Sequence, residues 1–205
     1  MAGAVSECRV VLASGSPRRH DLLNLVGISH EVRPANIDET MRSRETPHRH
    51  AERLAREKAT VVATRDPNLI TIGADTIVVV NRKVLGKPTD AAHAAAMLRQ
   101  LSGRQHTVIT AVAVSSGKKL RSAVEEVRVK FRKLRDDEID SYIATGEPLD
   151  KAGAYGIQGY GATIVECVEG DYFAVMGLPL ARLVGLLHDV GVRYRFGQPL
   201  TASTE

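Results

Sequence analysis

The chain has 205 residues, of which 43% are hydrophobic and 25% charged, a balance that excludes a disordered or fibrous protein. Lys and Arg number 28 against 24 Asp and Glu, and this formal charge of +4 suits an anionic small molecule as well as a nucleic acid. The two cysteines, Cys8 and Cys167, are far apart in sequence and show no CxxC or Cys/His spacing, so neither a disulfide framework nor a structural zinc site is indicated. We find no signal peptide and no apolar run of ~18 residues, and we therefore expect a cytoplasmic protein without a membrane partner.

The first half of the chain alternates between strand and helix patterns. The helix at 46–65 has Thr46 at its N-cap, Pro47 at its first position and apolar residues on one face. The predicted elements in chain order are a strand at 9–13, a helix at 17–27, a strand at 30–35, a helix at 46–65 and an extended segment at 69–80.

The second half contains more strands. We predict a helix at 89–103 capped by Thr89, two strands that turn at Gly117, a helix at 136–145, two strands within 163–177 and a helix at 178–191. This order predicts a mixed sheet flanked by helices. We expect one domain over residues 1–205, with a core at about 9–192, a loose N-terminal lead and a loose tail after Phe196.

The stretch SGSPRR follows directly on an apolar strand. Ser16 suits an N-cap and Pro17 a first helical position, which leaves the amides of Arg18 and Arg19 in the first turn of a helix. Such amides, together with two guanidinium groups, attract phosphate oxygens. A capped helix with solvated arginines explains the stretch equally well.

Asp75, in GADT, stands at the end of an apolar strand, where ligands collect in α/β proteins. It is a candidate general base or Mg²⁺ ligand, and a capping aspartate is the alternative. Lys58, in LAREKA, borders the inward face of its helix and can reach a site or extend to water. Lys87, in GKP, lies in a loop, where a solvated cation is the plain alternative.

Several motifs are absent from the sequence. It contains no GxxxxGK[ST], and its glycines at 156, 159 and 161 neither match GxGxxG nor open a helix after a strand, which removes support for kinase and dinucleotide-binding classes. It contains no HExxH zinc motif. Aromatic residues make up only 4% of the chain, too few for the stacking surfaces of a nucleic-acid-binding module.

Taken in order, LASGSPRR, NIDE, LAREKA, GADTIV, GKP, LSGR, TAV, DKAGAYGIQG and GLPL resemble the Maf family of nucleoside triphosphate pyrophosphatases, from about residue 10 to residue 190. The resemblance implies a mixed α/β fold of the Maf/ITPase-like kind, with a twisted sheet flanked by helices and two lobes around a central cleft. It also implies a hydrolase acting on phosphoric anhydrides, a nucleotide diphosphatase that releases a nucleoside monophosphate and pyrophosphate.

The resemblance assigns roles to individual residues. Asp75 corresponds to the catalytic acid, the proton acceptor that activates water. Positions associated with substrate choice are Arg18, Thr76 and Gln158. Polar residues that line the phosphate end of the substrate are Ser14, Arg19, Lys58 and Lys87. The acids on the metal side are Asp75 and Glu39.

DKAGAYGIQG resembles the branch of the family that prefers dTTP and UTP, where Gln158 suits the O4 and N3–H edge of the base. The alternatives are a preference for 7-methyl-GTP, a broader specificity, modified pyrimidine nucleotides as substrates, or a regulator that binds nucleotides without cleaving them. The resemblance further implies Mg²⁺ or Mn²⁺ as cofactor and a homodimer, with no nucleic acid as a partner.

Overall fold

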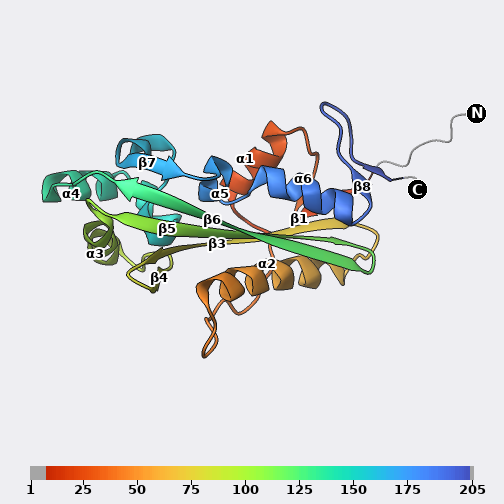
Figure 1. Ribbon diagram of the computed structural model, residues 1–205, viewed down its shortest axis with the longest axis horizontal. Coiled ribbons are helices and arrows are strands. Elements are labelled where there is room, and N and C mark those ends of the chain that lie inside the picture. Colours follow the sequence, from red (N-terminus) through yellow and green to blue (C-terminus); the bar gives the residue numbers. More distant parts are fainter. Residues whose placement is uncertain (1–7, 204–205) are drawn as a thin grey trace, which may run out of the picture. The chain divides into compact units, whose positions relative to one another are not determined.

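The computed structural model describes residues 8–203 and contains a mixed sheet with helices packed against it (Figure 1). Hydrogen-bonded neighbours follow the strand order β2-β1-β3-β5-β6-β7, and β4 pairs with β3. The pairings of β1 with β2 and with β3 are parallel, whereas those of β3 with β4 and of β6 with β7 are antiparallel. The predicted mixed α/β class is therefore confirmed, while the central cleft stays a prediction.

The contacts of the chain divide it into two compact units. Unit 1 takes its described residues from Met1–Asp75, Ala111–Val124 and Gly177–Glu205, and unit 2 consists of Thr76–Thr110 and Glu125–Met176. Three long strands pass from one unit into the other: β3 (Ile70–Val80), β5 (Gln105–Ser116) and β6 (Lys119–Phe131). The prediction of a single domain over residues 1–205 stays a prediction.

Unit 1 holds its strands between helices. Its own elements are β1 (Val10–Leu12), α1 (Pro17–Leu25), β2 (Glu31–Val32), α2 (Pro47–Ala63), α6 (Leu180–Asp189), β8 (Val192–Arg193) and β9 (Thr201–Ala202). Helices α1 and α6 lie on one face of the strands and α2 on the other (Figure 1). The α2 helix begins as predicted, with Pro47 at its first position and the Thr46 hydroxyl accepting a hydrogen bond from the Arg49 amide at 3.3 Å.

Unit 2 contains shorter elements. These are β4 (Lys83–Leu85), α3 (Ala91–Leu101), α4 (Asp136–Ala144), the 3₁₀ turns η1 (Glu147–Asp150), η2 (Ala152–Ala154) and η3 (Gly159–Thr163), β7 (Val165–Glu169) and α5 (Tyr172–Met176). The turn at Gly117 between β5 and β6 has the expected positive φ of 57°.

Two sequence predictions in unit 2 were wrong. The apolar run at 172–177 is the helix α5 rather than a strand, because the Asp171 carboxylate accepts a hydrogen bond from the Phe173 amide at 2.8 Å and starts a helical turn. A short apolar run does not by itself distinguish the two. The N-cap of α3 is Asp90, whose carboxylate accepts from the His93 amide at 2.7 Å, rather than Thr89.

The ends of the chain were expected to be loose. Most of the N-terminal lead lies outside the described residues, but the Cys8 amide donates to the Leu200 carbonyl at 2.8 Å. In the tail, β9 pairs antiparallel with β8 and Leu200 is buried. The described part of the tail is therefore packed rather than loose.

The core of unit 2 contains a buried histidine among aromatic rings. The His106 ring packs edge-on against Phe131, with centroids 4.9 Å apart, and its Nε2 lies 2.8 Å from the Tyr155 hydroxyl. Its Nδ1 has no hydrogen-bond partner among the residues that the structure describes. Burial lowers the pKa of His106 to about 4, because a protonated ring at this position would lack the water that stabilises its charge.

We predict that His106 makes the fold sensitive to acid. Its folded pKa of about 4 lies below the value of ~6.5 in an unfolded chain, so its contribution is complete above pH ~6.5 and is lost as the pH falls towards 4. The loss should reach about 3 kcal/mol. Urea unfolding at several pH values checks this against His106→Gln, which does not titrate and should show a shallower dependence. Equal slopes for the two proteins would contradict the prediction.

Candidate active site

The segment after β1 and the start of α1 carry Ser14, Arg18 and Arg19. Pro17 is the first residue of α1, as predicted, and Ser16 stands at the N-cap, but its hydroxyl makes no capping hydrogen bond. The Ser16 amide instead donates to the Ser14 hydroxyl at 3.3 Å. The Ser16 side chain therefore does not cap the first turn of α1, and anion binding at this helix start stays a prediction.

Arg19 is buried and joins three segments of unit 1. Its Nε donates to the Gly177 carbonyl at 2.8 Å, and its Nη1 lies 2.9 Å from both the Ser14 hydroxyl and the Ala74 carbonyl. Burial lowers the pKa of Arg19, an effect that the nearby Asp75 carboxylate opposes. Arg19 thus fixes the backbone immediately before Asp75, a contribution that the sequence did not reveal.

A buried ion pair connects α2 with β3. The Lys58 ammonium lies 2.8 Å from Asp75 Oδ1 and 2.7 Å from Glu39 Oε1. Lys58 and Asp75 are each 7% exposed, whereas the Glu39 side chain is 58% exposed. Lys58 therefore points at the predicted catalytic acid and does not extend to water, while its role at the phosphate end of a substrate stays a prediction.

Gly73 explains why Lys58 meets Asp75. A Cβ at Gly73 would overlap the Ala55 carbonyl oxygen and lie 2.7 Å from the Ala59 amide nitrogen. Only glycine permits α2 to pack this closely on β3. Lys58 lies one turn of the helix beyond Leu54 and next to Ala59, on the buried face.

Unit 2 contains the other predicted residues. The Thr76 hydroxyl is 3.0 Å from that of Thr110, which donates to the Ala174 carbonyl at 2.7 Å. Lys87 is exposed in the loop after β4, and Gln158 is exposed at the start of η3. The residue before Lys87 is tied to η2, because the Gly153 amide donates to the Gly86 carbonyl at 3.0 Å.

The predicted residues fall into two groups, one in each unit of the chain. The first group lies in unit 1 and is connected through Arg19 and Lys58: Ser14, Arg19, Glu39, Lys58 and Asp75, with Arg18 beside Arg19 on α1. The second group lies in unit 2: Thr76, Lys87 and Gln158. The two groups meet along the chain at the peptide bond between residues 75 and 76.

The acids on the metal side suit a divalent cation only in part. In residues 8–203, no group of three or more His, Cys, Asp or Glu side chains is placed to hold a metal ion. Asp75 and Glu39 nevertheless both pair with the Lys58 ammonium, which brings the two carboxylates close to each other. Mg²⁺ is commonly held by one or two carboxylates plus substrate phosphates and water, and this pair fits that requirement.

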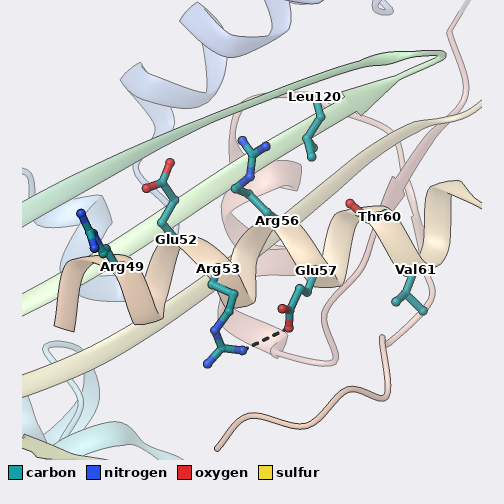
Figure 2. A pocket seen from close by; sticks show the side chains of 8 residues that line it. All are labelled: Arg49, Glu52, Arg53, Arg56, Glu57, Thr60, Val61 and Leu120. Carbon is teal, nitrogen blue, oxygen red and sulfur yellow. Dashed lines mark hydrogen bonds and ion pairs between the residues drawn. The ribbon is translucent and has the colours of Figure 1, made fainter. Parts of the chain in front are cut away.

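A separate surface groove of about 540 Å³ runs along α2 (Figure 2). Arg53 pairs with Glu57 at 3.1 Å, while Arg56 donates to the Ser122 hydroxyl, which in turn donates to Glu52. These charges largely satisfy one another. The groove therefore lacks the concentrated positive charge of a phosphate site.

The fold and the first group define a class of protein: a mixed α/β chain in which a buried carboxylate, an ammonium and an arginine-bearing helix start come together, an arrangement that suits the binding of phosphate groups. The family model described as Maf-like protein matches residues 9–190. The chain belongs to the Maf family.

Curated relatives match nearly the whole chain. The dTTP/UTP pyrophosphatase of Pelotomaculum thermopropionicum is 50% identical over 184 residues, which cover 89% of this chain and 96% of that protein. The protein of the same name from Moorella thermoacetica is 50% identical over 186 residues, 90% of this chain and 96% of its own. The dTTP/UTP pyrophosphatase of Bacillus pumilus is 45% identical over 184 residues, which cover 90% of this chain and 97% of that protein.

Replacing Gly73 by alanine should push α2 away from β3 and weaken the Lys58–Asp75 contact. We expect the free energy of unfolding to fall by about 1–3 kcal/mol, as for other overpacked contacts. Urea unfolding measures the change. Gly185→Ala in α6 is the matched control, because no atom lies within 4 Å of its added Cβ and the helix should gain slightly. Unchanged stability of the Gly73 variant would show that α2 adapts without cost.

Proposed function

We propose that this protein hydrolyses dTTP and UTP to the nucleoside monophosphate and pyrophosphate. The observation that carries the proposal is the buried Asp75 carboxylate, held by Lys58 and next to a backbone carbonyl fixed by Arg19. The names of the curated relatives and their coverage of the chain support the same reaction.

Asp75 acts as the base. Lys58 donates to its Oδ1, which fixes the carboxylate and leaves Oδ2 to accept a hydrogen bond from the attacking water. The water oxygen forms a bond to the α phosphorus as the bridging bond to the β phosphate breaks. The water proton passes to Asp75 and then to solvent, and the bridging electrons leave with pyrophosphate.

Positive side chains balance the charge of the triphosphate. An ammonium has three N–H donors, of which Lys58 directs two at Asp75 and Glu39, leaving one for a phosphate oxygen. We assign Arg18, Arg19, Lys87 and the Ser14 hydroxyl to the same polyphosphate. Positioning and electrostatic stabilisation are the main catalytic contributions in such transfers.

Asp75 and Glu39 would hold Mg²⁺ or Mn²⁺. When bound, the ion would neutralise part of the phosphate charge as a Lewis acid. Gln158 recognises the nucleobase, because its carboxamide offers both the donor that O4 requires and the acceptor that N3–H requires. Thr76 and Arg18 contribute to substrate choice.

A cytoplasmic homodimer is what the family resemblance implies, and both properties stay predictions. Among the described residues, no helix is both long and apolar enough to cross a membrane. Gel filtration with light scattering decides the oligomeric state.

The reaction is tested by incubating the protein with a panel of nucleoside triphosphates and Mg²⁺ or Mn²⁺. We expect pyrophosphate as first product, fastest with dTTP and UTP, and a ~10²- to 10⁴-fold loss of rate in Asp75→Asn, which keeps the shape but removes the base. Asp140→Asn, an exposed change on α4, should leave the rate unchanged. Orthophosphate as the first product would overturn the proposed cleavage point. If 7-methyl-GTP were the best substrate, the proposed preference for pyrimidine nucleobases would be overturned.

Lys58 and Gln158 should respond differently to substitution. Lys58→Met removes a charge that serves every triphosphate, so turnover should fall alike for all bases. Gln158→Ala should change the ranking of bases, since only recognition of the base is lost. kcat/KM for dTTP, UTP, CTP and ATP measures both effects. If Gln158→Ala lowers all four equally, Gln158 does not read the base.

A further inference from the structure

The Gln158 loop, residues 156–161, is rich in glycine and leads into the short 3₁₀ turn η3, which begins at Gly159. Three of its six residues are glycines, Gly159 has a positive φ of 65°, and Gln158 is exposed. Glycines adopt many backbone conformations, so such a loop does not by itself hold a side chain in one place. A Gln158 that discriminates between bases requires support from outside the loop.

The Glu147 carboxylate lies directly against the second half of this loop. Its Oε2 accepts a hydrogen bond from the Tyr160 amide at 2.9 Å, and its Oε1 accepts one from the Gly161 amide at 3.0 Å. The fit is close: a Cβ at Gly159 would lie 2.5 Å from Glu147 Oε2. The glycine at 159 therefore provides the space that the carboxylate occupies.

Tyr142 extends the same support to the first half of the loop. Its hydroxyl donates to Glu147 Oε1 at 2.8 Å and accepts from the Gly156 amide at 3.1 Å. Backbone amides on both sides of Gln158 are therefore attached to one carboxylate–phenol pair. Burial raises the pKa of Glu147, but the hydrogen bonds from Gly161, Tyr142 and Tyr160 outweigh it and leave the pKa below its ordinary value.

We infer that Glu147, acting with Tyr142, is a positioning residue for nucleobase selection: it fixes the Gln158 loop so that the carboxamide of Gln158 meets a pyrimidine edge. The inference rests on the proposed role of Gln158. In this assignment, Glu147 contacts neither Asp75 nor the residues assigned to the polyphosphate. Its effect is therefore confined to the choice of base.

Glu147→Gln tests the inference. The carboxylate accepts three hydrogen bonds with two oxygens, whereas a carboxamide has one oxygen, and its NH₂ group would face a backbone N–H. We expect KM for dTTP and UTP to rise about tenfold, as for a lost charged hydrogen bond, with kcat within about twofold and CTP and ATP nearly unaffected. Tyr142→Phe removes the donor to Glu147 Oε1 and frees the Gly156 amide, but it leaves the bonds of Glu147 to the Tyr160 and Gly161 amides, and it should give about a threefold rise in the same direction.

Glu166→Gln is the matched control, because it makes the same chemical change on β7, where Glu166 pairs only with the exposed Lys130 in unit 2. It should leave every constant unchanged. Circular dichroism melting shows whether each variant folds. If Glu147→Gln does not fold, the result for Tyr142→Phe decides whether the positioning role holds.

Parallel measurement of Gln158→Ala separates the possible failures. If Gln158→Ala alters the ranking of bases but Glu147→Gln and Tyr142→Phe do not, the positioning role is overturned and the proposed function stands. If Gln158→Ala leaves the ranking unchanged, the base-reading role of Gln158 fails, and the inference fails with it. An equal loss of kcat on all bases in Glu147→Gln would indicate a general structural role and would also overturn the inference.

Discussion

The site depends on one buried ion pair, Lys58 with Asp75. Both side chains are buried, and removing a charge from water costs several kcal/mol unless an opposite charge and hydrogen bonds compensate. The pair requires α2 to pack closely on β3, which the missing Cβ of Gly73 allows. A strand residue without a side chain is therefore as necessary to the chemistry as the two charged residues.

Arg19 stabilises the same region in a different way. Its guanidinium holds the carbonyl of Ala74, the residue before Asp75, together with the Ser14 hydroxyl and the Gly177 carbonyl. An arginine whose donors are taken up by the protein's own backbone orders a site, whatever it also contributes to substrate binding. We therefore regard the helix start of α1 as both a support for Asp75 and the proposed phosphate-binding element.

Recognition of the base requires a different kind of order. Arg19, Lys58 and Asp75, at the proposed phosphate end, lie on regular elements, whereas Gln158 lies in a glycine-rich loop before the short 3₁₀ turn η3. Glu147 and Tyr142 supply the missing constraint through the backbone amides of that loop. In the proposed assignment, the choice of nucleobase could be altered without changing Asp75, since the two proposed functions depend on different hydrogen bonds.

The sequence by itself determined the elements whose signals are local: the apolar face and the Thr46 cap of α2, the long strand β3 and the turn at Gly117. Its ordered motifs also identified the family and the candidate residues. Only the tertiary structure decided that Arg19 reaches a carbonyl 158 residues away, that Lys58 is buried against Asp75, that residues 172–176 form a helix and that Glu147 supports the Gln158 loop. These outcomes depend on contacts between distant segments, and the spacing of residues along one helix or strand carries no information about such contacts.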